Sequence, residues 1–446
     1  MNQQGSVLTL FVGACLTALM LFVIPVTQAQ LKLPRISPNA EVSQIIGPTT
    51  IKIDYSRPGV KGREIWGKLV PYDQVWRAGA NDATTISFST DVTIDGKKLA
   101  AGSYSFFILP TANEWTFIFN SEPKQWGAFS YNKEKDVLRL TVKPEAAPHQ
   151  EWMSFNLEDL KPTSCKFVLR WEKLVAGVTI ETPAAPKNAR LSQAATVKQT
   201  VGITDILVNY SRPGVKGRVT WGKLVPFNDV WRAGANEATT VSFTDDVLIN
   251  GNKLAAGTYG FFILPTEKDW TFIFNGEPKQ WGAFKYNKEK DVLRVPVTPE
   301  LIPNQEWLEY NIDPIKSSSA TLSLSWETMR AGVTVEVDTT PSFIMNKVKA
   351  QVGATMDDAG ILNQAARYAL NSKQDFDDAM TWAQKSVTMK KTYTNLRLVA
   401  ELNAQVGKTE DAIKMGEEAI KVGKEQDPKL NTTQFEKMID DWKGKK

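Results

Sequence analysis

The pattern of apolar and polar residues divides the chain into an apolar leader, a long β-type region and a helical tail. Residues 50–55, 85–89 and 115–119 alternate, or run apolar, over the length of a strand. No helical period persists between these segments, so crossover helices are missing and a parallel α/β sheet is excluded. The pattern predicts a mainly β protein whose domains are antiparallel sandwiches of the jelly-roll kind, each with about nine short strands.

An internal repeat sets the domain organisation. The string YSRPGVKGR starts at Tyr55 and again at Tyr210, 155 residues later, and the same offset links GKLVP, WRAGAN, FFILPT, QWGAF and YNKEKDVLR without a gap. The offset also pairs twelve of the 14 tryptophans. One domain is therefore duplicated, and we place its copies at residues 38–183 and 193–338.

The clearest local signal inside each copy is a hairpin. The first copy has Asp95-Gly96 between apolar strands, and the second has Asn250-Gly251 at the same place. Both dipeptides suit a type I′ turn, which needs positive φ at its two central residues.

The tail, residues 345–446, changes to a helical period. One apolar helix face comprises Ala379, Trp382, Ala383 and Ser386. A second pair of helices is predicted at 396–406 and 409–422, and Gly407, Ala412 and Ala419 lie where tetratricopeptide repeats place small residues. We expect up to two divergent repeats that dock a protein partner. The alternative is a plain helical hairpin packed on the second β domain.

The leader places the protein outside the cytoplasm. Residues 7–26 are apolar and Ala29 follows as a small residue, which predicts a signal peptide over residues 1–29. A retained membrane anchor is the alternative, because 20 apolar residues can span a bilayer; lipidation at Cys15 is a third interpretation. The expected location is periplasmic or secreted, without membrane contact once the leader is cut.

Composition removes several classes of function. The net charge is +4 without a long basic run, so a nucleic-acid partner is not indicated. With one histidine, His149, and two cysteines, the chain cannot build a Ser-His-Asp triad, a Cys-His pair or a multi-histidine zinc site in each copy. No cofactor and no metal site are indicated.

The string YSRP-x-x-KGR-x-x-WG-x-LVP-x-x-x-x-WR-x-GAN, followed by the hairpin and AG-x-Y-x-FFILP, resembles the DUF2911 family over residues 40–181 and 195–337. This resemblance implies exported bacterial domains of unknown function, often joined to tetratricopeptide repeats, and it implies no activity. The family pattern tends to read GANE, whereas the first copy has Asp82 after Asn81 and the second keeps Glu237.

A polar cluster in each copy is the candidate ligand-binding surface. Arginine can form a bidentate contact with carboxylate or phosphate, and tryptophan can stack on a sugar ring. The alternative is structural, with Trp76 in the core, Arg77 paired with Asp82 or another carboxylate, and Asn81 holding a turn. The candidates are Arg57, Lys61, Arg63, Trp76, Arg77, Asn81 and Asp82, with Arg212, Lys216, Arg218, Trp231, Arg232, Asn236 and Glu237.

Paired carboxylates are the remaining catalytic option. Asp136 and Glu151 recur as Asp291 and Glu306, and a glycosidase needs two carboxyl groups about 5–9.5 Å apart. Solvated charges at strand ends are the favoured explanation for them. A calcium site at Asp73, Asn81 and Asp82 lacks the spacing of known calcium loops.

These observations predict a non-enzymatic envelope protein with two binding modules for a glycan or protein and a helical interaction tail. A carbohydrate-active hydrolase and a purely structural envelope component are the alternatives.

Overall fold

The computed structural model describes residues 31–444, so the predicted signal peptide lies outside the described residues. Contacts divide these residues into one unit over 32–348, which holds both β domains, and another that holds 349–444. Within the described part of the chain, none of the helices has the length and apolarity to cross a membrane.

The first β domain contains ten strands among the described residues. They are β1 (Asn39–Ile46), β2 (Thr49–Ser56), β3 (Thr84–Phe88), β4 (Val92–Ile94), β5 (Lys97–Leu99), β6 (Gly102–Pro110), β7 (Trp115–Asn120), β8 (Asp136–Val142), β9 (Glu145–Lys161) and β10 (Ser164–Glu181). The sequence predicted about nine short strands, but β9 and β10 are 17 and 18 residues long.

The second β domain repeats this order. Its strands are β11 (Gln193–Val201), β12 (Thr204–Arg212), β13 (Thr239–Phe243), β14 (Val247–Ile249), β15 (Asn252–Leu254), β16 (Gly257–Pro265), β17 (Trp270–Asn275), β18 (Asp291–Val297), β19 (Glu300–Lys316) and β20 (Ser319–Val337). The prediction of two tandem antiparallel β domains is confirmed.

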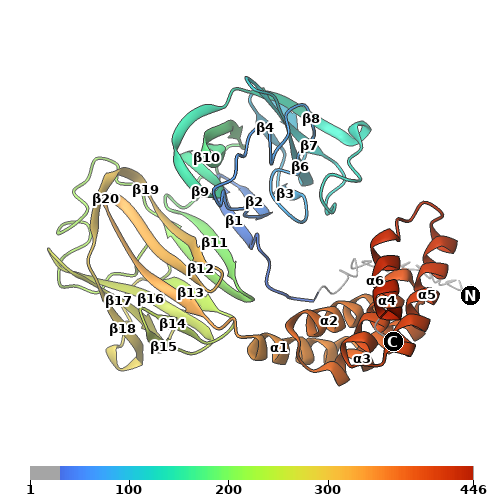
Figure 1. The fold of residues 1–446 in the computed structure, drawn as a ribbon. Helices are drawn as coiled ribbons and strands as arrows, with labels where there is room; N and C mark the ends of the chain where they lie inside the picture. The colour runs from blue at the N-terminus through green and yellow to red at the C-terminus, as the bar shows by residue number, and fades with distance from the viewer. Residues whose placement is uncertain (1–30, 445–446) are drawn as a thin grey trace, which may run out of the picture. The chain divides into compact units, whose positions relative to one another are not determined.

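Each domain has two antiparallel sheets (Figure 1). In the first domain the larger sheet has the order β1-β2-β3-β6-β7-β8 and the smaller has β5-β4-β10-β9. Strands of the larger sheet mostly follow one another along the chain, which is the order of a meander rather than the Greek-key order of a jelly roll. Asp95, Gly96, Asn250 and Gly251 all have positive φ, as the predicted type I′ hairpins require.

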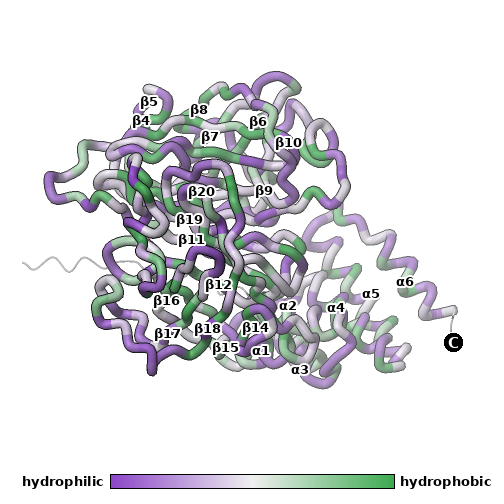
Figure 2. Tube along the Cα trace, turned by 90° about the vertical axis from the view of Figure 1, so that its left-hand side faces the viewer, coloured by the Kyte–Doolittle hydropathy of each residue, from purple (hydrophilic) through white to green (hydrophobic). Residues whose placement is uncertain are grey.

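An aromatic core joins the two sheets of the first domain. Phe106 on β6 contacts the rings of Phe155 on β9 and Phe167 on β10, with ring centroids 5.8 and 5.1 Å apart. All three side chains are fully buried. Apolar and polar residues alternate along many strands (Figure 2), because one side of each sheet faces this core.

The two larger sheets join edge to edge into one sheet of 12 strands through β1 and β11. The pairing is antiparallel, and Val42 lies opposite Val197, its own counterpart in the repeat. The seam is therefore self-complementary, like the interface of a two-fold dimer. It also protects two strand edges that would otherwise be open to aggregation.

Over its described residues the tail contains helices and no strands. They are α1 (Pro341–Ala354), α2 (Ala359–Ser372), α3 (Phe376–Met389), α4 (Tyr393–Gln405), α5 (Thr409–Gln426) and α6 (Thr433–Lys443). The predicted face of α3 is confirmed, because its buried residues are Ala379, Trp382, Ala383 and Ser386.

Helix α4 begins 34 residues after α2, which matches the period of tetratricopeptide repeats. Ala412 and Ala419 are buried as expected. Gly407, however, does not pack between helices: it is exposed in the turn after α4 and has a φ of 80°. The repeat interpretation itself stays a prediction.

Candidate functional site

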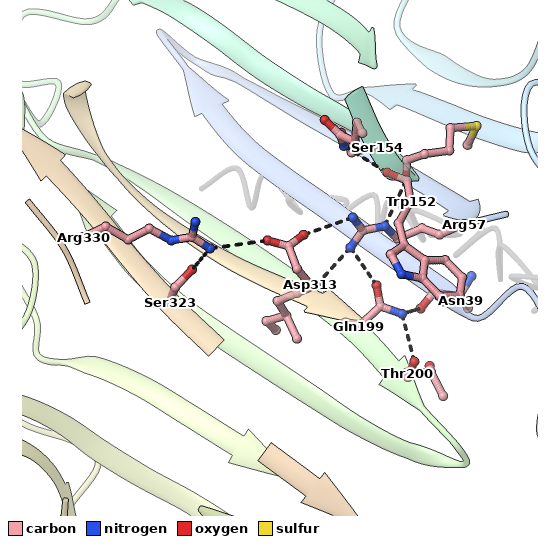
Figure 3. Close-up of polar contacts among 12 residues, drawn as sticks. Asn39, Arg57, Trp152, Ser154, Gln199, Thr200, Asp313, Ser323 and Arg330 are labelled. Atoms are coloured by element: carbon pink, nitrogen blue, oxygen red, sulfur yellow. Dashed lines mark hydrogen bonds and ion pairs between the residues drawn. The ribbon is translucent and has the colours of Figure 1, made fainter. Parts of the chain in front are cut away.

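Arg57 lies at the seam between the two β domains, where it is 5% exposed (Figure 3). Its Nε donates to the Met153 carbonyl within the first domain, at 2.9 Å. Its Nη1 donates to Gln199 Oε1 at 3.1 Å and to the Ile312 carbonyl at 2.9 Å, and its Nη2 lies 3.2 Å from Asp313 Oδ1. The guanidinium thus connects a carbonyl of the first domain with three groups of the second.

Arg212 makes the reciprocal contacts from the second domain. Its Nε donates to the Leu308 carbonyl at 2.9 Å, and its Nη1 lies 3.3 Å from Gln44 Oε1 and from the Leu157 carbonyl. Glu158 occupies the position equivalent to Asp313 but bonds Arg170 instead. Both candidate arginines are therefore structural, because each satisfies carbonyl groups of the opposite domain.

The loops before β3 and β13 hold the next pair of candidates. Arg63 donates to the carbonyls of Val60 and Gly59, at 3.1 and 2.5 Å, and so closes its own loop. Lys61 has its Nζ 5.6 Å from the Trp152 ring centroid, while its backbone N–H donates to Glu151 at 2.8 Å. Arg218 and Lys216 repeat these contacts in the second copy.

Trp76 belongs to a cluster of four indoles. It stacks on Trp171 with a centroid distance of 5.8 Å and meets Trp66 edge to face, and Trp66 in turn contacts Trp115. Its Nε1 donates to the Gly79 carbonyl at 3.1 Å. Trp231 does the same in the second copy. The indole therefore fixes the loop that follows it.

Asn81 and Asp82 also have partners within the first β domain or in the segment just before it. Asn81, at a φ of 57°, donates to the Ser37 carbonyl and to Ser56 Oγ, as the structural alternative expected of a turn residue. Asp82 lies 3.2 Å from Arg35 Nη1, and Glu237 pairs with Arg190 at 2.7 Å. The expected pairing of Arg77 with Asp82 is wrong, because a residue outside the motif, 47 positions earlier, takes this carboxylate.

Arg77 and Arg232 differ from the other candidates in lacking a partner. Neither side chain forms a hydrogen bond or ion pair with another described residue, and the Nε of each is buried. Burial lowers the pKa of both guanidinium groups. A charged group that is half-buried without a counter-charge is unfavourable, so its presence in both copies calls for an explanation.

The backbone beside Arg77 is unusual as well. The next residue, Ala78, is fully buried and has a φ of 51°, and its counterpart Ala233 has a φ of 54°. Such a conformation costs a residue with a Cβ about 1 kcal/mol or more and concentrates at functional positions. The chain accepts this strain next to the arginine in both copies.

A groove of about 530 Å³ surrounds Arg77. Its cationic lining residues are Lys61, Arg63 and Arg77, and no carboxylate lines it. Trp76, Trp171 and Phe129 supply aromatic surface. A groove with this lining favours a ligand that carries negative charge and a ring.

Phe129 is the functional candidate that sequence reasoning missed. It is 84% exposed, and Phe284 at the equivalent position is 83% exposed. Arg77 lies close by, since a Cβ added at Gly127 would be 3.3 Å from its Nη1. The repeated QWGAF string contains this residue, but only the structure shows that the ring is outside the core.

The carboxylates of the hydrolase alternative have separate surroundings. Asp136 accepts from Tyr131 and Arg139, each at 2.6 Å, and from Asn120 at 2.9 Å. Burial first, and then Asp136, raises the pKa of Tyr131 to about 12. Glu151 accepts instead from the backbone of Lys61. Asp291 and Glu306 have equivalent contacts, so neither pair shares a hydrogen-bonding partner.

Among the described residues, no group of three or more His, Cys, Asp or Glu side chains could hold a metal ion. Of the calcium candidates, Asp73 is exposed in a turn with a φ of 61°. Asn81 points its amide nitrogen, a donor, at its neighbours.

Comparison with known proteins matches two segments, residues 37–180 and 192–335, to the model of a family described as a protein of unknown function (DUF2911). Together they make up more than half of the chain. No curated protein matches the sequence.

Proposed function

Because the chain belongs to the DUF2911 family, whose description assigns no role, we propose a function from the site itself. We infer that the protein is a non-enzymatic binding protein of the cell envelope. Each β domain binds an anionic group on a ring-bearing ligand, such as a uronic acid of an envelope glycan, through Arg77 or Arg232. The observation that carries this proposal is the buried, unpartnered Nε of both arginines.

The chemistry of the groove supports an acidic sugar. A carboxylate would supply the counter-charge that the protein withholds from Arg77, in a bidentate geometry. Phe129 exposes an apolar ring beside it, on which a sugar ring can pack. Duplication of the site raises the apparent affinity for a polymer, because the second contact becomes intramolecular.

The leader and the tail complete the proposal. The apolar leader exports the chain to the compartment that contains such glycans. The spacing of α2 and α4 favours a repeat-type helical tail that docks a protein partner.

Binding of oligogalacturonate to the full-length protein, measured by calorimetry at low salt, tests this function. Arg77→Ala and Arg232→Ala should each weaken binding about tenfold, and the double variant should weaken it further. Lys98→Ala, at an exposed position on β5, is the matched charge control and should bind as the parent does.

If Lys98→Ala weakened binding as much as the arginine variants do, the affinity would reflect only the net charge of the protein, and the proposal would be contradicted. Unchanged binding in the double arginine variant would contradict it as well. Shortening of the oligosaccharide during incubation would show turnover and favour the hydrolase alternative.

A further inference from the structure

The outer face of the larger sheet carries a second groove, in the second copy, that is separate from the arginine groove. It has a volume of about 460 Å³ and is lined by residues of β11, β12 and β13 together with the segment 278–281. Its aromatic lining residue on the surface, Trp281, is 57% exposed.

A row of neutral polar side chains crosses this groove. Thr196 on β11 lies opposite Asn209 on β12, which lies opposite Thr240 on β13. Thr196 Oγ1 donates to Asn209 Oδ1 at 2.9 Å, which fixes the orientation of the amide. The Asn209 Nδ2 and the Thr240 hydroxyl make no hydrogen bond to any described residue, so both remain available at the surface.

The first copy has different chemistry at the same place. The equivalent row contains Glu41, Asp54 and Thr85, so two carboxylates replace the hydroxyl and the amide. These carboxylates are already engaged, because Lys52 lies 2.7 Å from Glu41 and Asn39 donates to Asp54 at 2.8 Å. The polar face of the first copy is thus charged and satisfied internally.

A single small residue opens the groove in the second copy. Ala194 occupies the position of Asn39, and its side chain is too short to reach across to β12. The amide that covers Asp54 in the first copy therefore has no equivalent over Asn209. The second copy thus keeps the fold of the first, but its groove exposes the unpaired donors of Asn209 and Thr240 next to the indole of Trp281.

We propose that this groove of the second copy binds a neutral saccharide. The sugar ring packs against Trp281, and its hydroxyl groups exchange hydrogen bonds with Asn209, Thr196 and Thr240. An exposed indole beside uncharged donors and acceptors suits a ring with apolar C–H faces and polar edges. Glu237 and Lys279 also line the groove. Glu237 is already paired with Arg190, whose guanidinium lies 5.6 Å from the Trp281 ring centroid, so the sugar ring packs on the part of the indole that Arg190 leaves exposed.

The test uses the full-length protein with neutral gluco-, manno- and galacto-configured oligosaccharides as probes, measured by calorimetry. Trp281→Ala should weaken binding of the preferred probe at least about tenfold. Trp126→Ala removes the equivalent indole of the first copy, which is 55% exposed, and should leave binding unchanged.

A second variant uses a residue pair that the same fold already accommodates in the first copy, so it is expected to fold. Ala194→Asn combined with Asn209→Asp installs the pair that Asn39 and Asp54 already form in the first copy. This double variant should lose at least about tenfold in affinity.

The proposal is overturned if none of the three probes binds at millimolar concentration, if the double variant binds as the parent does, or if Trp126→Ala has the same effect as Trp281→Ala. It is independent of the arginine sites. Neutral-sugar binding should persist in the Arg77→Ala, Arg232→Ala variant and should be insensitive to salt.

Discussion

The two β domains share a fold but differ where each meets something outside its own core. The indole cluster, the loop of Arg77 and the contacts of Asp136 recur in the second copy with nearly equal distances. Some differences lie in the core, where Phe155 becomes Tyr310 and both are buried. Others change what each copy contacts. Asn39 becomes Ala194 at the groove of the second copy, and Thr90 becomes Asp245, which holds Lys347 of α1 at 2.5 Å.

This comparison separates two kinds of constraint. Many positions that stay the same build the core or line the arginine groove, and among their charged side chains Arg77 and Arg232 each keep a buried Nε without a hydrogen-bond partner. Asp245 is a changed position that gives the second copy a partner, Lys347, which the first copy does not have. A duplicated domain can diverge in this way because one copy keeps the original surface while the other changes.

The largest expected effect concerns the seam. Arg57→Ala should lower the free energy of unfolding by about 3 kcal/mol, because it leaves buried carbonyls of both domains without a donor. Arg212→Ala should cost less, about 2 kcal/mol, since no carboxylate of the first domain faces Arg212 in the way that Asp313 faces Arg57. Chemical denaturation followed by tryptophan fluorescence measures both values.

Arg77→Ala is the control for these two variants, because its guanidinium bonds no described residue. It should change stability by about 1 kcal/mol or less. A loss as large as that of Arg57→Ala would show that Arg77 is a structural residue and would remove the basis of the proposed function.

A medium effect is expected where α1 meets the second copy. Asp245 accepts from Thr204 and Thr244 as well as from Lys347. Asp245→Thr, which restores the residue of the first copy, should speed amide exchange in residues 341–348 about tenfold. Lys349→Ala, which breaks an exposed pair with Asp378, should leave exchange in this segment unchanged.

The same contact predicts a dependence on acid. Burial acts to raise the pKa of Asp245, but the hydrogen bonds from Lys347, Thr244 and Thr204 outweigh it and lower the pKa below its usual value. The stabilisation is therefore present above the unfolded-state pKa and is lost as the pH falls through the lower folded-state value. Amide protection in residues 341–348, measured relative to the intrinsic exchange rate at each pH, that stays the same under acid would contradict this role.

The smallest effect should be equal in the two copies. Burial, followed by the hydrogen bond to Asp136 or Asp291, raises the pKa of Tyr131 and Tyr286 to about 12. Asp136→Asn and Asp291→Asn should each lower the pKa of the adjacent tyrosine part of the way toward its ordinary value, because burial remains. Alkaline titration of tyrosinate absorbance measures the shift.

The raised pKa values of Tyr131 and Tyr286 also determine how the stability of the folded state changes with pH. The tyrosines contribute stability that is complete below about pH 10 and is lost between about pH 10 and 12, because the folded state holds these protons more tightly. If the pKa shift were found for only one of Tyr131 and Tyr286, the two domains would not be equivalent at this position.

The sequence by itself determined the features that repeat or alternate along the chain. The 155-residue repeat, the strands near residues 50, 85 and 115, the type I′ hairpins and the buried face of α3 all follow from local patterns. Such patterns report which side of an element is buried, because periodicity reflects the geometry of a single strand or helix.

Only the tertiary structure decided what each polar residue does. Arg57 reaches a carbonyl 255 positions away, and Asp82 pairs with Arg35 rather than with its neighbour Arg77. The groove of the second copy depends on Ala194. Nothing in the local sequence marks this residue, and its role is visible only from the pairing of β11 with β12. Hydrogen bonds and ion pairs require a match in space between distant segments, and no local pattern records that match.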